Sequence, residues 1–254
     1  MIMKIIICGC NGKMGKAIVK ATQNYNDCKI AAGVDKIVDS QASFPTYTSI
    51  ENVKEKADVI IDFSHPSALD SILNYSEKTN TPAVLCTTGF SNEQVEKIKN
   101  ASKTMPVFYS RNMSLGINLL IELAKKATEI LEKDFDIEII EKHHNQKIDA
   151  PSGTALMIAE EISQTCESKK NFIYDRSSTR KAREKSEIGI HSLRGGTIPG
   201  DHEVIFAGNK EIITISHHAE SRDIFANGAL KAAYFLKDKP KGFYTMKDVI
   251  HNQF

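Results

Sequence analysis

The chain lacks the features that mark several classes of protein. It has 254 residues, and none of its apolar runs approaches the roughly 20 residues that a membrane-spanning helix needs. The first apolar run, residues 5–8, stops at Gly9 and is also too short for the core of a secretory signal. Neither charge is in excess, because 33 Lys and Arg residues oppose 32 Asp and Glu residues. We therefore expect a cytoplasmic protein with a small-molecule partner, no membrane association and no nucleic-acid partner.

Cysteine is scarce and has no pairing pattern. The five cysteines are Cys8, Cys10, Cys28, Cys86 and Cys166. Their number is odd and no two have the C-x-x-C spacing, which argues against a disulfide framework and against a zinc ribbon. We expect reduced thiols, most of them buried, and no metal site.

In the first part of the chain, short β-branched runs alternate with longer amphipathic stretches. They predict strands at residues 4–8, 30–34, 59–62, 83–86 and 107–109, and helices at 13–24, 66–79 and 91–102. Ser91 and Gln94 have capping-box spacing at the start of the third helix. Such alternation is typical of βαβ units, so the sequence predicts an α/β fold with a Rossmann-type, doubly wound parallel sheet.

The pattern changes after Asn112. It predicts a long helix at 114–131, then strands at 135–144, 188–194, 202–207 and 211–219, with few helices between them, and a last helix at 224–236. This part is typical of a second α+β domain with an open mixed sheet. The length suits two domains, and we expect residues 1–112 with 223–254 to form one and residues 113–222 to form the other.

Three glycines follow the first predicted strand with G-x-x-G-x-x-G spacing. Gly9 permits a tight turn, Gly12 a close approach of a pyrophosphate, and Gly15 close packing of the helix that follows. Asp35 ends the second strand about 20 residues later, where an acid accepts hydrogen bonds from the adenosine ribose. An acid there favours NADH, whereas the next residue, Lys36, can pair with the 2′-phosphate of NADPH, so the sequence leaves both cofactors open.

Two further loops follow strands of the same predicted sheet. Thr87 and Thr88 come directly after the fourth strand, and Ser110 and Asn112 come directly after the fifth. The carboxyl ends of parallel strands form the ligand-binding edge of such sheets, so both loops are candidates for contact with the cofactor.

The densest polar segment, residues 141–155, carries the candidate chemistry. His143 and His144 are adjacent on a predicted strand, so their side chains point to opposite faces and cannot easily chelate one metal. Two histidines beside Lys147 suit another task, because such groups supply protons near neutral pH and bind carboxylates.

A helix start follows within the same segment. Ser152 or its neighbour is expected to cap this helix, and its first backbone N–H groups, at Gly153 and Thr154, form an anion site suited to a carboxylate. A dinucleotide domain joined to a domain with a carboxylate site and a proton donor is typical of a reductase.

Residues 169–185 are rich in Lys, Arg and Ser and poor in apolar residues. This composition favours a solvated loop, near a polyanionic ligand or at an assembly surface, over a nucleic-acid-binding patch.

The segment 141–155, with the sequence EKHHNQKIDAPSGTA, resembles the signature of the 4-hydroxy-tetrahydrodipicolinate reductases, also called dihydrodipicolinate reductases, of the diaminopimelate route to lysine. The resemblance continues through the glycine turn and through the segments 62–64, 87–90, 112–118, 194–196, 200–202 and 225–229. It implies reduction of a cyclic dicarboxylate by NADH or NADPH. It also implies a homotetramer built by the second domain, which would bind the substrate.

The resemblance also implies roles for individual residues. His143 would be the general acid/base and Lys147 the proton donor, while His144, Lys147, Gly153 and Thr154 would hold the substrate carboxylates. The cofactor would be bound by Gly9, Cys10, Asn11, Gly12, Lys13, Met14, Asp35, Lys36, Cys86, Thr87, Thr88, Ser110, Arg111, Asn112 and Met113. Two of these depart from the family pattern: Cys86 stands where glycine is usual, and Arg111 where a small residue or proline is common.

Two alternatives remain from the sequence. One is another two-domain reductase, such as an amino-acid dehydrogenase, which would act on 2-oxo acids and ammonia. The other is a non-catalytic NAD(H) sensor, although a sensor has no need of the proton donors His143 and Lys147.

Overall fold

The computed structural model describes residues 2–252 and divides into two compact units. Unit 1 comprises Met1–Leu115 and Arg222–Phe254, and unit 2 comprises Gly116–Ser221. The first boundary lies slightly beyond the one expected from the sequence, because Met113 is buried in the core of unit 1.

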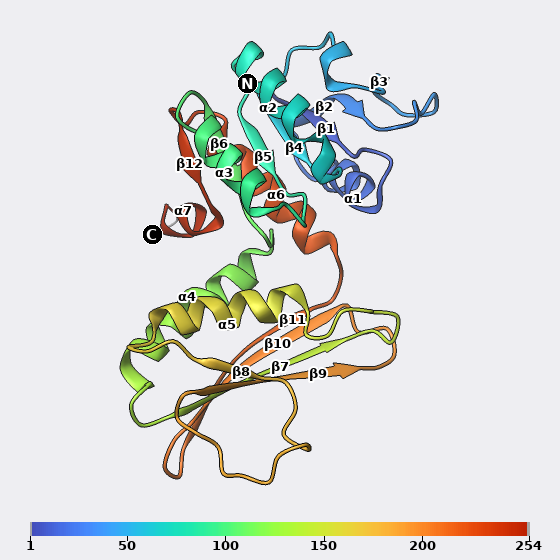
Figure 1. Cartoon of the computed structure of the whole chain (residues 1–254). Coiled ribbons are helices and arrows are strands. Elements are labelled where there is room, and N and C mark those ends of the chain that lie inside the picture. Colours follow the sequence, from blue (N-terminus) through green and yellow to red (C-terminus); the bar gives the residue numbers. More distant parts are fainter. Residues whose placement is uncertain (1, 253–254) are drawn as a thin grey trace. The chain divides into compact units, whose positions relative to one another are not determined.

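Unit 1 is built on a seven-stranded parallel sheet with the order β12-β6-β5-β4-β1-β2-β3 (Figure 1). Its strands are β1 (Met3–Cys8), β2 (Cys28–Val34), β3 (Thr46–Tyr47), β4 (Val59–Asp62), β5 (Ala83–Leu85), β6 (Pro106–Tyr109) and β12 (Gly242–Tyr244). Its helices are α1 (Lys13–Thr22), α2 (Leu69–Thr79), α3 (Asn92–Ala101), α6 (Asp223–Leu236) and α7 (Met246–His251), with short 3₁₀ turns η1 (Ile50–Asn52) and η2 (Pro66–Ala68).

Helices cover both faces of this sheet. Alternate side chains of β1 separate into two cores: Ile5 and Ile7 pack with α1, α6 and α7, while Ile6 and Cys8 pack with α2 and α3. Strands that are buried on both faces have continuous apolar runs in their sequence, and these runs made the central strands predictable from the sequence. The Rossmann-type parallel sheet predicted from the sequence is confirmed.

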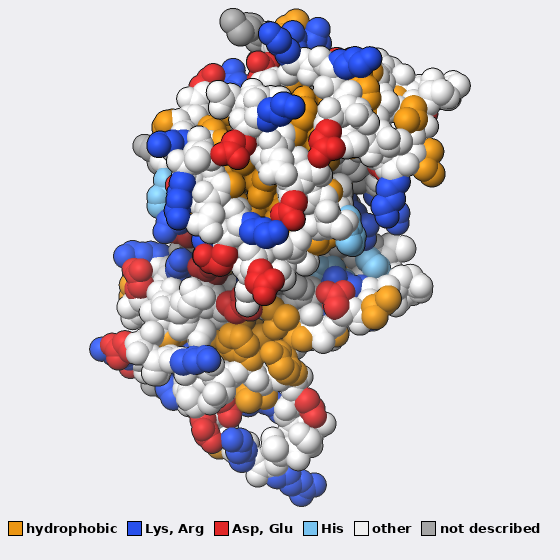
Figure 2. Space-filling model, turned by 45° about the horizontal axis from the view of Figure 1, so that its top comes forward, with side chains coloured by type: hydrophobic (Ala, Val, Ile, Leu, Met, Phe, Trp, Pro, Cys, Tyr) orange, Lys and Arg blue, Asp and Glu red, His pale blue; other side chains and the backbone are white. Residues whose placement is uncertain are grey.

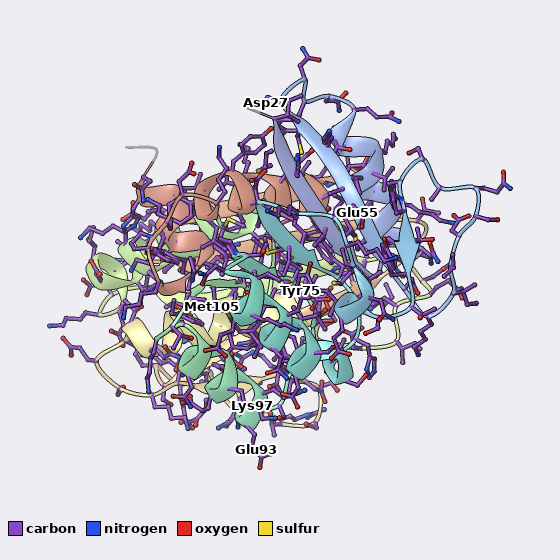
Figure 3. All side chains as sticks on the ribbon, turned by 90° about the horizontal axis from the view of Figure 1, so that it is seen from above. Asp27, Glu55, Tyr75, Glu93, Lys97 and Met105 are labelled. Atoms are coloured by element: carbon purple, nitrogen blue, oxygen red, sulfur yellow. The ribbon has the colours of Figure 1, made fainter. Side chains whose placement is uncertain are left out.

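Helices α2 and α3 lie on the same face of the sheet, and an ion pair joins their outer sides. The Lys97 ammonium lies 2.9 Å from the Asp70 carboxylate, and both side chains are exposed. Lys97 is labelled on α3 in Figure 3. Exposed pairs of this kind stabilise a fold by at most about 1 kcal/mol, so burial of the apolar face fixes these helices. The predicted capping box of Ser91 and Gln94 is present at the start of α3.

Unit 2 has a five-stranded mixed sheet with the order β11-β10-β7-β9-β8. Its strands are β7 (Asp136–His143), β8 (Asn171–Ile173), β9 (Glu187–Arg194), β10 (Gly200–Ala207) and β11 (Ile212–Ala219), and its helices are α4 (Leu115–Leu131) and α5 (Gly153–Thr165). Strands β7, β10 and β11 pair antiparallel, whereas β7, β9 and β8 pair parallel. Both helices pack on one face of the sheet, which confirms the predicted α+β unit (Figure 1).

The basic segment 169–185 is mostly an exposed loop, as expected, apart from the short strand β8 near its start. Several of its cations pair with carboxylates of unit 2. Arg183 binds Asp136 and Glu138, at 2.8 and 2.9 Å. The almost fully buried Lys170 ammonium lies 2.7 Å from Glu132. The expected place of this segment, near a polyanionic ligand or at an assembly surface, stays a prediction.

Positive and negative side chains are interspersed over the molecular face in Figure 2, in keeping with the balanced composition. All five cysteines are free thiols, four of them buried, as predicted. No helix among residues 2–252 is long and apolar enough to span a membrane.

Candidate functional site

The glycine turn of unit 1 has the backbone that its spacing predicts. Gly9 has φ +81°, a left-handed conformation that favours glycine, and a Cβ there would lie 2.6 Å from the Phe63 carbonyl oxygen. A Cβ on Gly15 would lie only 2.3 Å from the Gly9 carbonyl oxygen. Helix α1 starts at Lys13 with no side chain capping it, so its first N–H groups point to the edge where a phosphate would bind.

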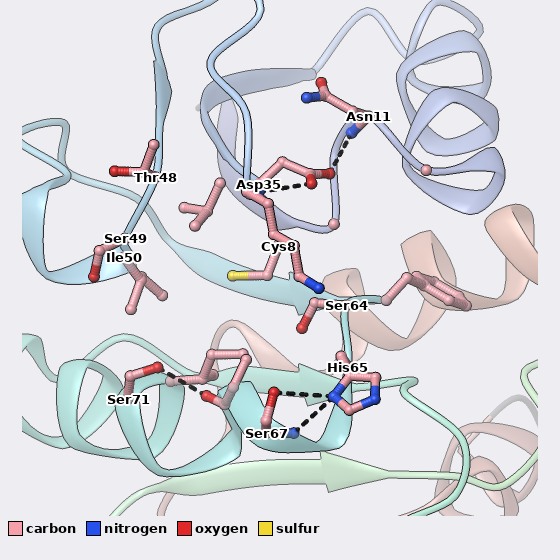
Figure 4. Close-up of a pocket in the computed structure, with 17 residues that line it drawn as sticks. Cys8, Asn11, Asp35, Thr48, Ser49, Ile50, Ser64, His65, Ser67 and Ser71 are labelled. Carbon is pink, nitrogen blue, oxygen red and sulfur yellow. Dashed lines mark hydrogen bonds between the residues drawn. The ribbon is translucent and has the colours of Figure 1, made fainter.

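A cavity of about 560 Å³ lies beside this turn, at the carboxyl ends of β1, β2 and β4 (Figure 4). Five residues predicted to bind the cofactor line it: Gly9, Asn11, Gly12, Asp35 and Lys36. The other side of the cavity was not predicted from the sequence, and it includes Thr48, Ser49, Ser64, His65, Ser67 and Ser71. These polar residues come from the turn before η1, from η2 and the turn before it, and from the start of α2, and nothing in their local sequence marks them as lining a cavity.

Asp35 joins the glycine turn to the end of β2. Its Oδ2 accepts a hydrogen bond from the Asn11 backbone N–H at 2.8 Å, and its Oδ1 accepts one from the Lys36 N–H at 2.7 Å (Figure 4). A carboxylate has about four acceptor positions, so both oxygens can also accept hydroxyl groups of a ribose. The carboxylate is thus positioned for a nucleoside and lies in a cavity within the size range of small-molecule sites.

The other ten predicted cofactor residues do not line this cavity: Cys10, Lys13, Met14, Cys86, Thr87, Thr88, Ser110, Arg111, Asn112 and Met113. Several have side chains engaged within unit 1. The buried Thr87 hydroxyl donates to Asp62 Oδ2 at 2.8 Å, and the Ser110 hydroxyl donates to the Asn112 carbonyl at 2.7 Å. Any cofactor contact of Thr87 and Ser110 would therefore come mainly from the backbone, and it stays a prediction.

In unit 2, His143 ends strand β7 and is nearly buried. Its Nδ1 lies 2.5 Å from Glu141 Oε2, and a Cβ at Gly200 would lie 3.0 Å from its Nε2. Glu141 is fully buried and forms a two-point ion pair with Arg194, at 2.7 and 2.8 Å. Burial alone would raise the pKa of the Glu141 carboxyl, but the hydrogen bonds from His143 and Arg194 outweigh burial and hold this pKa well below its usual range.

Ser152 caps helix α5, as predicted. Its Oγ accepts a hydrogen bond from the Ala155 N–H at 3.1 Å, and its own N–H donates to Glu141 Oε1 at 3.1 Å. The same Oγ lies 3.1 Å from Nε2 of the buried His202. The exposed Gly153 begins the helix, so the predicted carboxylate site lies directly beside the Glu141 and His143 cluster.

Lys147 lies in the turn between β7 and α5. Its ammonium is 2.8 Å from the Asp149 carboxylate. The Lys147 ammonium, with smaller contributions from the backbone N–H groups of Asp149 and Gly153, lowers the pKa of the Asp149 carboxyl. An internal carboxylate therefore occupies part of the place predicted for a substrate carboxylate. His144, half-buried, follows the end of β7, and its backbone carbonyl accepts the Lys147 N–H at 3.1 Å.

No role was predicted for Glu141, Arg194 or His202 from the sequence. Residues two apart on a strand have side chains on the same face, so the sequence could have predicted the contact between Glu141 and His143. The other two depend on strand register: His202 pairs with Glu141 across β10 and β7, and Arg194 pairs with His143 across β9 and β7. Within residues 2–252, no three His, Cys, Asp or Glu side chains are grouped to hold a metal ion.

Two family models match the chain, both described as dihydrodipicolinate reductase. The model of the N-terminal part matches residues 3–113, and the model of the C-terminal part matches residues 116–250. The chain belongs to the dihydrodipicolinate reductase family. It is thus an oxidoreductase that uses a nicotinamide cofactor, which decides against a non-catalytic sensor.

Individual relatives of the dihydrodipicolinate reductase family match over the whole chain. A 4-hydroxy-tetrahydrodipicolinate reductase of Caldanaerobacter subterraneus subsp. tengcongensis is 51% identical over 250 residues, covering 98% of this chain and 99% of that protein. One of Clostridium tetani is 50% identical over 252 residues, covering 99% and 98%.

Solved structures are similar as well. The dipicolinate-bound dihydrodipicolinate reductase from Paenisporosarcina sp. TG-14 matches with a TM-score of 0.82 and 25% identity, covering 96% of this chain and 98% of that one. A diaminopimelate dehydrogenase of C. glutamicum, with a TM-score of 0.52, 13% identity and coverage of 96% and 92%, shares the fold alone.

Proposed function

We propose that this chain reduces 4-hydroxy-tetrahydrodipicolinate to tetrahydrodipicolinate, with unit 1 binding NADH or NADPH and unit 2 binding the substrate. The single observation that carries the assignment of residues is the cluster at the end of β7. There a histidine oriented by a carboxylate, a lysine and a helix N-terminus lie within one short segment. The family assignment and the names of the relatives support the substrate.

The residues around the glycine turn fit a nicotinamide dinucleotide. Gly9 and Gly12 leave room for the pyrophosphate at the start of α1, and Asp35 would accept the adenosine ribose hydroxyls. Lys36 lies on the same cavity and could pair with a 2′-phosphate, so we propose that either NADH or NADPH is accepted. When bound, the reduced cofactor supplies the hydride, which goes to C4 of the cyclic substrate.

The substrate carboxylates would bind at the start of α5. Gly153 and Thr154 are the first residues of α5, and the N-terminus of a helix stabilises an anion through its N–H groups and the helix dipole. Lys147 and His144 would supply positive charge from the preceding turn. One carboxylate of the substrate would take the place that Asp149 holds on Lys147. The similar reductase from Paenisporosarcina sp. TG-14 was solved with dipicolinate, a cyclic dicarboxylate, which agrees with a site of this kind.

The proton would come from His143 and Lys147. Because Nδ1 of His143 faces Glu141, its Nε2 is the ring nitrogen left to serve the substrate. We assign His143 as the general acid/base and Lys147 as a second donor that also binds a carboxylate. Loss of water from the 4-hydroxy substrate precedes the reduction and would use the same groups.

We also propose a homotetramer formed through unit 2, and a cytoplasmic location. Strand β11 is an edge strand of the open sheet and carries the exposed side chains of Ile212 and Ile213. Exposed apolar side chains on an edge strand are typical of a surface that another copy covers. Light scattering of the purified protein measures the assembly, and a monomer at micromolar concentration would contradict the tetramer.

Initial rates test the reaction. The purified protein is mixed with 4-hydroxy-tetrahydrodipicolinate, generated by the preceding synthase, and with NADH or NADPH in separate runs. We expect oxidation of the cofactor that depends on both protein and substrate, and none with simple 2-oxo acids plus ammonia. Turnover of the 2-oxo acids instead would indicate an amino-acid dehydrogenase. Tight cofactor binding with no oxidation of the cofactor in the presence of 4-hydroxy-tetrahydrodipicolinate would contradict the proposed substrate.

A further inference from the structure

We propose that Glu141, held by Arg194, is a positioning residue that builds both halves of the substrate site, orienting the acid/base His143 and fixing the start of helix α5. The inference rests on the proposed function of His143 and adds a residue to that site.

The contacts of the Glu141 carboxylate are complete within unit 2. Oε2 accepts from Arg194 at 2.8 Å and faces His143 Nδ1 at 2.5 Å. Oε1 accepts from Arg194 at 2.7 Å and from the Ser152 N–H at 3.1 Å. The residue has no exposed surface. A buried carboxylate with four donors in fixed directions has one orientation, so the groups that it binds are fixed as well.

The first consequence concerns His143. A carboxylate at Nδ1 fixes the orientation and tautomer of the ring, which leaves Nε2 to exchange the proton with the substrate. The charged or titratable groups around His143 are Glu141, Arg194 from β9, Lys147 from the following turn and His202 from β10. The His202 ring lies 5.3 Å away, edge to face, and burial lowers its pKa to about 3. His202 is therefore neutral and adds no positive charge against a protonated His143.

The second consequence concerns the carboxylate site. The Ser152 N–H is tied to Glu141, and Ser152 caps the helix whose N-terminus would receive the substrate carboxylate. Arg194 also donates to the backbone carbonyl of Asp149 at 2.5 Å, and the Asp149 side chain holds Lys147. The ion pair of Glu141 and Arg194 thus connects His143, the Ser152 cap of helix α5 and the turn that carries Lys147.

A merely structural ion pair between strands β7 and β9 would predict something different. Removal of a merely structural pair would lower the stability of the fold, and it would change the rate by the same factor with or without His143. A residue that positions His143 acts on the chemical step through that ring, so its effect on kcat should vanish when His143 is absent, whereas its effect on the carboxylate site should remain as a raised KM.

A double-mutant cycle on the full chain separates the two. We expect Glu141→Gln to lower kcat by about 10²-fold, within the range of general acid–base catalysis. In a His143→Ala background, we expect the same substitution to change the remaining kcat by less than about threefold. Equal losses in both backgrounds, or no loss in the wild-type background, would overturn the inference.

Removing one charge of a buried pair can unfold a protein, because the other charge is left uncompensated. The variant Glu141→Gln/Arg194→Met removes both charges, and we expect it to fold and to show the same loss of kcat. A second measurement needs no variant: in ¹⁵N-histidine NMR spectra of the wild-type protein, the neutral ring of His143 should carry its proton on Nδ1. A neutral ring protonated on Nε2 would overturn the inference, whatever the variants do.

The outcomes also separate this inference from the proposed function. If His143→Ala retains the wild-type kcat, the proposed acid/base role fails. If His143→Ala loses activity while Glu141→Gln keeps it, the acid/base role stands and only the positioning role fails.

Discussion

Acid should destabilise unit 2 through one buried histidine, His202. Its side chain is 4% exposed, and its Nε2 contacts the Ser152 hydroxyl. Its Nδ1 has no hydrogen-bond partner among the described residues, so protonation would place a second N–H in the core without an acceptor. Burial, followed by the nearby His143, lowers the pKa of His202 from its ordinary 6.5 to about 3.

The direction of the pH effect follows from this pKa. Between about pH 6.5 and pH 3 the unfolded chain binds a proton at His202 that the folded unit does not, so stability falls as the pH falls. The contribution is fully present above about pH 6.5 and is lost progressively down to about pH 3. Since one pKa unit corresponds to about 1.4 kcal/mol, lowering the pH from about 7 to about 5 should cost about 2 kcal/mol from His202 alone.

Hydrogen exchange of backbone amides measures this in the full chain, because the amides of β7 and β10 report on unit 2 and those of β1 and β4 report on unit 1. The matched variant is His202→Gln, whose amide can bind Ser152 but does not titrate. We expect the wild type to lose about 2 kcal/mol more than this variant in the unit 2 amides between about pH 7 and pH 5, and the unit 1 amides to show no difference. Equal losses in both proteins would refute the reasoning.

Three further predictions concern activity and the glycine turn. His143→Ala should lower kcat by about 10²-fold or more with little change in cofactor affinity, because only the proton transfer is lost; an unchanged kcat in folded protein would contradict it. Lys147→Ala should both lower kcat and raise KM, since one ammonium serves as proton donor and carboxylate partner. Steady-state kinetics measure both parameters, and a change in only one of them would contradict the double role. Gly15→Ala should destabilise unit 1 by about 1–3 kcal/mol and weaken cofactor binding, because its Cβ would overlap the Gly9 carbonyl. Thermal unfolding and cofactor titration measure this, and wild-type values in both would show that the turn tolerates a Cβ.

The parts of the fold that depend on local pattern could be predicted from the sequence. The turn around Gly9 follows from residue types at fixed spacing, and the central strands follow from apolar runs buried on both faces. The Ser152 cap likewise depends on neighbouring residues in the chain. Strands β3, β8 and β12 were missed because two or three residues cannot establish a period of two.

The organisation of the substrate site could not be predicted in the same way. Lys147 and His143 belong to one segment and were found together. Arg194 and His202 reach Glu141 only through the register of three strands, which no local pattern specifies. The ion pairs of Lys170 and Arg183 were not predicted for the same reason, since Glu132 and Asp136 are distant from them in the sequence.

Transfer of a labelled hydride tests the central claim most directly. The protein is incubated with 4-hydroxy-tetrahydrodipicolinate and with NADH or NADPH that carries deuterium at the transferable position, and the product is examined by mass spectrometry. We expect one deuterium atom in tetrahydrodipicolinate, at a rate that falls by about 10²-fold in His143→Ala. Tetrahydrodipicolinate without deuterium, or no product despite bound cofactor, would contradict the account.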